Sequence, residues 1–73
     1  MAIIEVKSDI TGSVWKVVKS VGDAVEEDEP IVILESMKME IPVTSAEPGI
    51  IRDILVTEGA TVTEGAVIAR LEV

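Results

Sequence analysis

The sequence is built from two related copies, and this internal repeat constrains the fold more than any other feature. Shifting the chain by 37 positions superimposes ten identical residues, among them Gly12 on Gly49 and Gly22 on Gly59. Two copies cannot form a solenoid, because a stack of repeats needs about three or more units to bury its core. We therefore predict a quasi-two-fold sandwich of two interlocking halves, which span about residues 3–36 and 40–73.

The repeated unit has the composition of a β-strand protein. Valine and isoleucine together number 22, against 3 leucines, and β-branched side chains fit a pleated, half-buried surface better than a helix. Short apolar segments alternate with clusters of Gly, Pro, Asp and Ser, which is typical of strands joined by turns. The predicted fold is all-β, a flattened antiparallel barrel or sandwich of two roughly four-stranded sheets. The predicted strands are Ile3–Lys7, Ser13–Val18, Ala24–Val25, Ile31–Glu35, Glu40–Thr44, Ile50–Val56, Thr61–Val62 and Val67–Glu72.

The composition excludes several classes of function. There is no cysteine and no histidine, so the chain offers no thiolate metal ligand and lacks the commonest general base. A formal charge of −8 would repel a phosphate backbone, which argues against nucleic acid as a partner. No apolar run approaches the roughly 20 residues that span a bilayer, and the first residues lack the basic start and apolar core of a signal peptide. We expect one domain, residues 1–73, that is cytoplasmic, binds no membrane and is monomeric in isolation.

The joint between the two copies lies at Met37–Met39, in the stretch ILESMKMEIPV (residues 33–43). Antiparallel pairing of the flanking segments would place Met37 and Lys38 at the corner of a short hairpin. Two-fold symmetry relates this joint to the gap between Val73 and Ile3, so we expect the two chain ends together at the opposite end of the molecule. Neither Met nor Lys is a favoured turn residue, unlike Asn-Gly or Asp-Gly, which indicates selection for something other than turn stability.

The residues ESMKME resemble the attachment motif of the biotinyl/lipoyl carrier domain family, in which the lysine between two methionines receives biotin. Thirty-five residues follow Lys38, the usual spacing in biotin carriers, and SDITGSV and SAEPGII resemble the paired strand openings of the family. The resemblance covers nearly the whole chain and is greatest to stand-alone attachment proteins and to the carrier subunits of acyl-CoA carboxylases. It implies a non-catalytic carrier whose covalently bound cofactor is biotin on Lys38.

The resemblance also implies roles for the neighbours of Lys38 and a set of partners. Met37 and Met39 would flank the lysine as exposed recognition residues, and Glu35 and Glu40 are candidates for recognition by the ligase. A biotin protein ligase would load Lys38, and the tethered biotin would carry carboxylate from a biotin carboxylase subunit to a carboxyltransferase subunit. Two alternatives remain open. One is a lipoyl or dual biotin/lipoyl carrier, although lipoate carriers usually have Asp in the place of Met37; the other is an unmodified structural copy of the fold.

Trp15 and the acidic run Glu26–Glu29 lie outside the attachment motif. Trp15, the sole aromatic residue, coincides with Arg52 in the other copy, so we expect it to face outward although tryptophan is usually buried. The acidic run Glu26–Glu29 is interpreted as a solvated loop.

Overall fold

A computed structural model describes residues 2–73, which fold into eight β-strands and contain no helix. Among these residues, therefore, no helix is long and apolar enough to cross a membrane. The strands, in chain order, are β1 (Ile3–Lys7), β2 (Gly12–Val17), β3 (Ala24–Val25), β4 (Pro30–Ser36), β5 (Met39–Thr44), β6 (Gly49–Ile54), β7 (Thr61–Val62) and β8 (Val67–Glu72).

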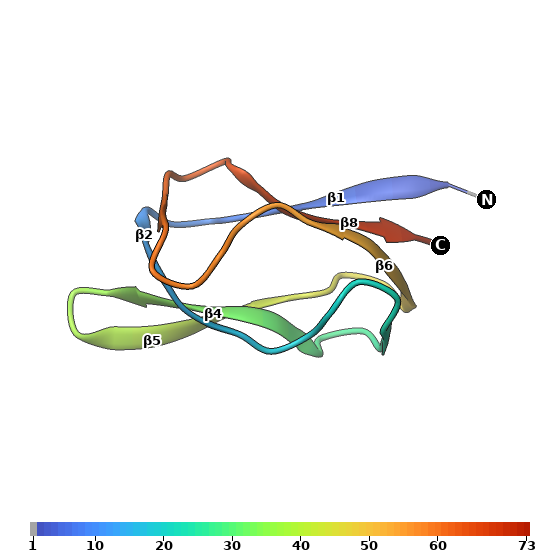
Figure 1. Ribbon diagram of the computed structural model, residues 1–73, viewed down its shortest axis with the longest axis horizontal. Coiled ribbons are helices and arrows are strands. Elements are labelled where there is room, and N and C mark those ends of the chain that lie inside the picture. The colour runs from blue at the N-terminus through green and yellow to red at the C-terminus, as the bar shows by residue number, and fades with distance from the viewer. Residues whose placement is uncertain (1) are drawn as a thin grey trace.

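The strands form two antiparallel four-stranded sheets that pack against each other (Figure 1). The strand order is β1-β8-β6-β3 in one sheet and β5-β4-β2-β7 in the other. The 37-residue repeat relates β1 to β5, β2 to β6, β3 to β7 and β4 to β8, and this exchange converts the first order into the second. Each sheet therefore combines strands from both halves, and the predicted fold class is confirmed.

The core follows the same symmetry. Its twelve buried apolar side chains fall into six pairs that are 37 positions apart in the sequence. Buried Ser8 and Ser45 form a further pair, and their hydroxyls donate to the carbonyls of Ile10 and Glu47 respectively, so that neither buried group lacks a partner. Equivalent positions thus fill equivalent places in the two sheets. The six core pairs are Val6 and Val43, Val14 and Ile51, Val25 and Val62, Ile31 and Ile68, Val32 and Ala69, and Leu34 and Leu71.

The predicted strands are confirmed, with bounds that differ from the observed ones by at most two residues. The largest difference is at the end of β6, which was predicted to reach Val56 and stops at Ile54. The chain then crosses to the other sheet, where the Gly59 N–H donates to the Val14 carbonyl (N···O 2.8 Å). This crossover, which the apolar pattern does not reveal, ends the strand.

The molecule is elongated, with dimensions of 37 × 18 × 18 Å. The β4–β5 hairpin forms one end of the long axis, and the two chain ends lie together at the other (Figure 1). There, Ala2 and Val73 exchange two backbone hydrogen bonds with N···O distances of 3.1 and 2.9 Å. The arrangement expected from the repeat, with the chain ends opposite the joint, is confirmed.

Candidate functional site

The chain reverses between β4 and β5 in a two-residue loop made by Met37 and Lys38. Ser36 pairs with Met39 on the last rung of the hairpin. The two loop residues have φ angles of 51° and 65°, the left-handed values that a type I′ hairpin turn requires at both positions. Lys38 therefore lies at the corner predicted from the joint of the repeat.

This turn is strained. Residues other than glycine in the left-handed region cost roughly 1–2 kcal/mol each, and Met and Lys lack the short polar group with which Asn or Asp offsets that cost. Asn-Gly would close the same hairpin without the strain. The fold therefore keeps two unfavourable residues at its outermost corner, as expected where function rather than stability selects the sequence.

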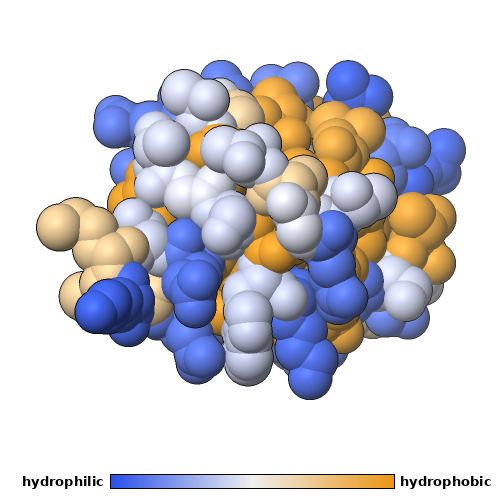
Figure 2. Space-filling model, turned by 60° about the vertical axis from the view of Figure 1, so that its left-hand side comes forward, coloured by the Kyte–Doolittle hydropathy of each residue, from blue (hydrophilic) through white to orange (hydrophobic). Residues whose placement is uncertain are grey.

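The side chains of the hairpin tip are exposed. Met37 is 92% exposed, more than any other large apolar residue described, and Met39 is 61% exposed, which confirms the expected exposure of both methionines. Lys38 is exposed between them and forms no ion pair with any residue among 2–73. Figure 2 brings this end forward and shows pale orange, moderately apolar side chains protruding beside blue, hydrophilic ones. Lys38 is therefore accessible from solvent and is flanked by two exposed apolar side chains.

Glu35 and Glu40 lie directly opposite each other on the rung below the turn. Both are exposed, and within residues 2–73 neither carboxylate forms an ion pair. Like charges placed directly opposite destabilise a strand pair. All five residues predicted for the site thus lie together on one hairpin, and that hairpin carries a second local cost beside its strained turn.

The end of β4 next to the turn lies against the start of β2. The Ser36 hydroxyl donates to the Thr11 carbonyl (Oγ···O 3.1 Å), and the Thr11 hydroxyl accepts from the Glu64 N–H (N···O 3.0 Å). Gly12 lies so close that a Cβ atom there would stand 2.6 Å from the Glu35 carbonyl oxygen. Thr11, Gly12 and Ser36 therefore fix the direction in which the tip points, a role that the attachment motif alone does not reveal.

Trp15 faces outward, as predicted, and is 48% exposed. It occupies a β-bulge, because the pairing of β2 with β4 passes from Val14 directly to Lys16. Arg52 occupies the equivalent bulge in β6. A bulge leaves its extra residue outside the regular alternation of the strand, which allows a large side chain to remain on the outer surface.

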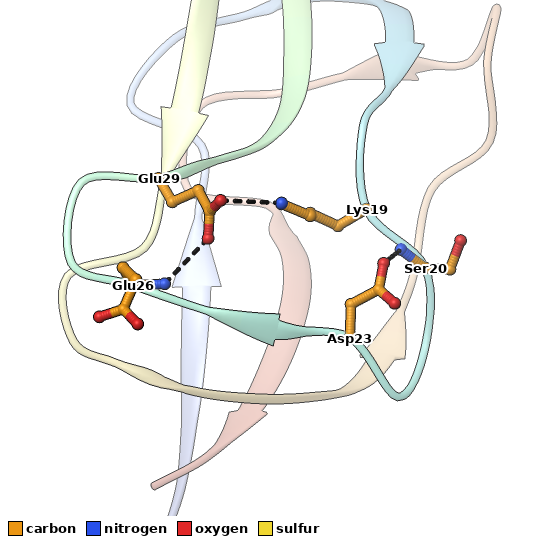
Figure 3. A network of polar contacts seen from close by, with 5 residues as sticks. All are labelled: Lys19, Ser20, Asp23, Glu26 and Glu29. Atoms are coloured by element: carbon orange, nitrogen blue, oxygen red, sulfur yellow. Dashed lines mark hydrogen bonds and ion pairs between the residues drawn. The ribbon is translucent and has the colours of Figure 1, made fainter.

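The acidic run Glu26–Glu29 is only partly a solvated loop. Its first three residues are exposed, but the Glu29 carboxylate accepts hydrogen bonds from Lys19 Nζ (2.9 Å) and from the Glu26 N–H (3.0 Å), as Figure 3 shows. The bond from Lys19, followed by the bond from Glu26, lowers the pKa of the Glu29 carboxyl below its ordinary value of 4.5. This network precedes β4 and so lies at the opposite end of that strand from the tip.

Nearly the whole chain matches one protein family. The family described as "Biotin-requiring enzyme" matches residues 3–71. The chain is 41% identical over 66 residues to the biotin/lipoyl attachment protein of Bacillus subtilis (strain 168), covering 90% of each chain. It is 42% identical over 65 residues to the "Biotinylated protein TB7.3 homolog" of Mycobacterium leprae (strain TN), covering 89% of this chain and 92% of the relative. The crystal structure of Kluyveromyces lactis urea carboxylase contains the same fold, with a TM-score of 0.93 and 33% identity over 99% of this chain and 6% of that one. The chain therefore belongs to the biotin/lipoyl attachment family.

Proposed function

We propose that this protein is a biotin carrier and that biotin is attached to Lys38. The observation that supports this best is the hairpin tip, where an exposed lysine lies between two exposed methionines on a strained two-residue turn. The tip is also at the far end of the molecule from both chain ends, so a modifying enzyme can approach it without contacting them (Figure 1).

The tip fits a covalently attached cofactor, because Lys38 offers a primary amine that no described residue pairs with. In the attachment that we propose, the unprotonated Nζ of Lys38 attacks the adenylate-activated carboxyl carbon of biotin. An amide bond forms, AMP leaves and the amine loses a proton. The ligase supplies the activated carboxyl group and accepts the released proton, while the carrier supplies the position of the nitrogen.

Once attached, biotin supplies a ureido ring that accepts and releases carboxylate. The side chain of Lys38 and the tail of the cofactor form an arm of roughly ten single bonds, which reaches more than about 10 Å. Such a tether makes delivery to a second site effectively intramolecular. We propose that the chain catalyses no reaction itself and serves biotin carboxylase and carboxyltransferase components, a proposal supported by its likeness to one part of a urea carboxylase.

A lipoyl carrier is the second candidate, because the name of the Bacillus subtilis relative covers both modifications. We favour biotin on two grounds. The residue before Lys38 is Met37, where lipoyl carriers usually have Asp, and the Mycobacterium leprae relative is named as a biotinylated protein.

Labelling by two purified ligases tests the proposal. Wild type and Lys38→Arg are incubated with biotin protein ligase, biotin and ATP, and separately with lipoate ligase, lipoate and ATP. We expect strong streptavidin binding by wild type after the first reaction and none by Lys38→Arg, because arginine keeps the charge and lacks the nucleophilic amine. The unfolding curves should coincide, since the side chain is exposed. Biotin on Lys38→Arg would refute the assignment of Lys38, and faster lipoylation than biotinylation of wild type would refute the choice of cofactor.

A further inference from the structure

The internal repeat allows the outer faces of the two sheets to be compared position by position. On the β5-β4-β2-β7 sheet, the register places Lys16 beside Ile33 and Ile33 beside Pro42, with Glu35 beside Glu40 one rung nearer the tip. The same register recurs on the other sheet. The equivalent residues at an offset of 37 are Trp15 and Arg52, Lys16 and Asp53, Ile33 and Arg70, Glu35 and Glu72, Ile3 and Glu40, and Glu5 and Pro42.

The outer face of the β1-β8-β6-β3 sheet, called here the equivalent face, pairs its own charges. Arg52 Nη1 lies 3.4 Å from Glu72 Oε2 across β6 and β8. Arg70 Nη1 lies 3.7 Å from Asp53 Oδ2 on the same pair of strands. Both arginines thus have an acidic partner within the chain, and the face requires no other molecule to compensate its charges.

The outer face of the β5-β4-β2-β7 sheet lacks both arginines. Trp15 stands at the bulge in place of one arginine and Ile33 in place of the other. Glu35, the equivalent of Glu72, is therefore left opposite Glu40 without a cation among the described residues. Ile33 is half-buried and does not belong to the group that packs against the core. We call these residues the docking face: Trp15, Ile33, Glu35, Glu40 and Pro42.

The docking face has an acidic row next to the hairpin tip, Glu35 and Glu40. Behind it lies an apolar pair, Ile33 and Pro42, and Lys16 of β2 continues the same row beyond Ile33. The complement of the docking face is a surface that carries arginine or lysine beside apolar groups. A cation over the indole of Trp15 would be held by the ring face and would lie where Arg52 lies on the equivalent face, within reach of the unpaired Glu35. A second copy of this chain is a poor match. Its formal charge is −8, its two arginines are already paired, and the exposed lysine of its hairpin tip lies next to its own Glu35 and Glu40.

We propose that the docking face binds the biotin ligase, through a basic and apolar patch of that enzyme; this inference rests on the proposed attachment to Lys38. Attachment differs physically from later carboxyl transfer. During attachment the lysine amine itself has to reach the reacting carbon, so protein surfaces next to the tip must come together. After attachment an arm of more than about 10 Å separates the reacting group from the carrier, so close contact at this face is not required. The docking face continues from the tip along β4 and β5, which fits the ligase.

Exchanging the two equivalent residues tests the proposal with a matched control. Trp15→Arg gives the docking face the arginine that the equivalent face has at this position. Arg52→Trp makes the reverse change on the equivalent face, to which we assign no role, and serves as the control. Initial rates of labelling by a purified biotin protein ligase, with biotin and ATP, give kcat and KM for the acceptor protein. We expect Trp15→Arg to raise KM at least tenfold with little change in kcat, and Arg52→Trp to leave both unchanged. Ile33→Arg, the second substitution of this kind, provides an independent variant if Trp15→Arg lowers the thermal midpoint.

A competition assay separates docking from chemistry. Lys38→Arg cannot be labelled but keeps the docking face, so it should inhibit labelling of wild type competitively. Adding Trp15→Arg to that competitor should raise its inhibition constant at least tenfold. Equal KM values for wild type, Trp15→Arg and Ile33→Arg would overturn the docking face while leaving Lys38 as the attachment residue. If the variants were labelled normally but, once biotinylated, were poor substrates in carboxyl transfer, the face would belong to the carboxylase and the proposed ligase contact would also be overturned. Failure of wild type to be labelled would refute the proposed function and the docking face together.

Discussion

Gly12 and Gly49 occupy equivalent positions in the two halves, but only Gly12 lies next to the hairpin tip. Comparing an alanine substitution at each position therefore distinguishes an effect on the direction of the tip from an effect on the stability of the fold. A Cβ atom at Gly12 would stand 2.6 Å from the Glu35 carbonyl oxygen, and one at Gly49 would stand 2.7 Å from the Glu72 carbonyl oxygen. An ordinary C···O separation is about 3.3 Å or more, so Gly12→Ala has to move the end of β4 by roughly 0.7 Å. Gly49→Ala makes the same demand on the end of β8, beside the chain ends.

Both substitutions should destabilise the fold to a similar extent. Overpacking lowers the free energy of unfolding by about 1–3 kcal/mol. Replacing glycine by alanine also lowers the conformational entropy of the unfolded chain, which raises the free energy of unfolding by about 0.4–1 kcal/mol. A net loss of about 1–2 kcal/mol lowers the thermal midpoint of a domain of this size by roughly 5–15 °C.

The effects on labelling should differ. Gly12→Ala shifts the two residues that lead into Met37 and Lys38, and a misplacement of about 1 Å can cost as much as 100-fold in rate, so we expect about a tenfold loss. Gly49→Ala should label at the wild-type rate. The assay is the initial rate of labelling by a biotin protein ligase, at a temperature where circular dichroism shows both variants fully folded. Equal rates for the two variants would show that the contact between Gly12 and Glu35 does not position the lysine.

Further predictions concern the turn, the arm and the acidic loop. Replacing Met37-Lys38 by Asn-Gly should stabilise the fold by about 1–3 kcal/mol in thermal unfolding while abolishing labelling, because relief of strain at two positions exceeds the extra chain entropy of glycine; an unchanged midpoint would refute the strain. Exchanging Met37 and Lys38 should lower the initial labelling rate at least tenfold with the same unfolding curve, and equal rates would contradict a positioned amine. The purified biotinylated chain should carboxylate no acyl-CoA unless carboxylase subunits are added. Because the pKa of Glu29 is lowered, its contribution to stability is present above pH 4.5 and is lost as the pH falls below that value. Glu29→Gln should therefore weaken the fall in thermal midpoint between pH 5 and pH 3, and an identical pH profile would refute this.

The repeat made the fold and the hairpin predictable from the sequence. Because the same apolar pattern occurs in both copies, each strand is predicted twice. The repeat also identifies pairs such as Val14 and Ile51 as equivalent core positions. The joint of the repeat then identifies Lys38 as a corner residue independently of the attachment motif. Symmetry also located the chain ends, which no local pattern indicates.

The polar contacts were not predictable in the same way, because they depend on how segments cross in space. The hydrogen bond between Ser36 and Thr11 joins residues 25 positions apart, and no pattern in either segment predicts it. The ion pair of Lys19 with Glu29 was detectable in principle, since the equivalent positions in the second copy are Val56 and Ala66. A cation and an anion that replace two apolar residues together are a signal of contact.

We propose that the fold presents a single lysine for modification. The chain has four lysines, Lys7, Lys16, Lys19 and Lys38, and only the last lies on the hairpin tip. The most direct measurement is the intact mass of wild type after reaction with a biotin protein ligase, biotin and ATP, followed by peptide mapping of the adduct. We predict a single biotinyl group, found entirely on Lys38. Biotin spread over several lysines, or found on a lysine away from the tip, would contradict the claim that the hairpin selects the site.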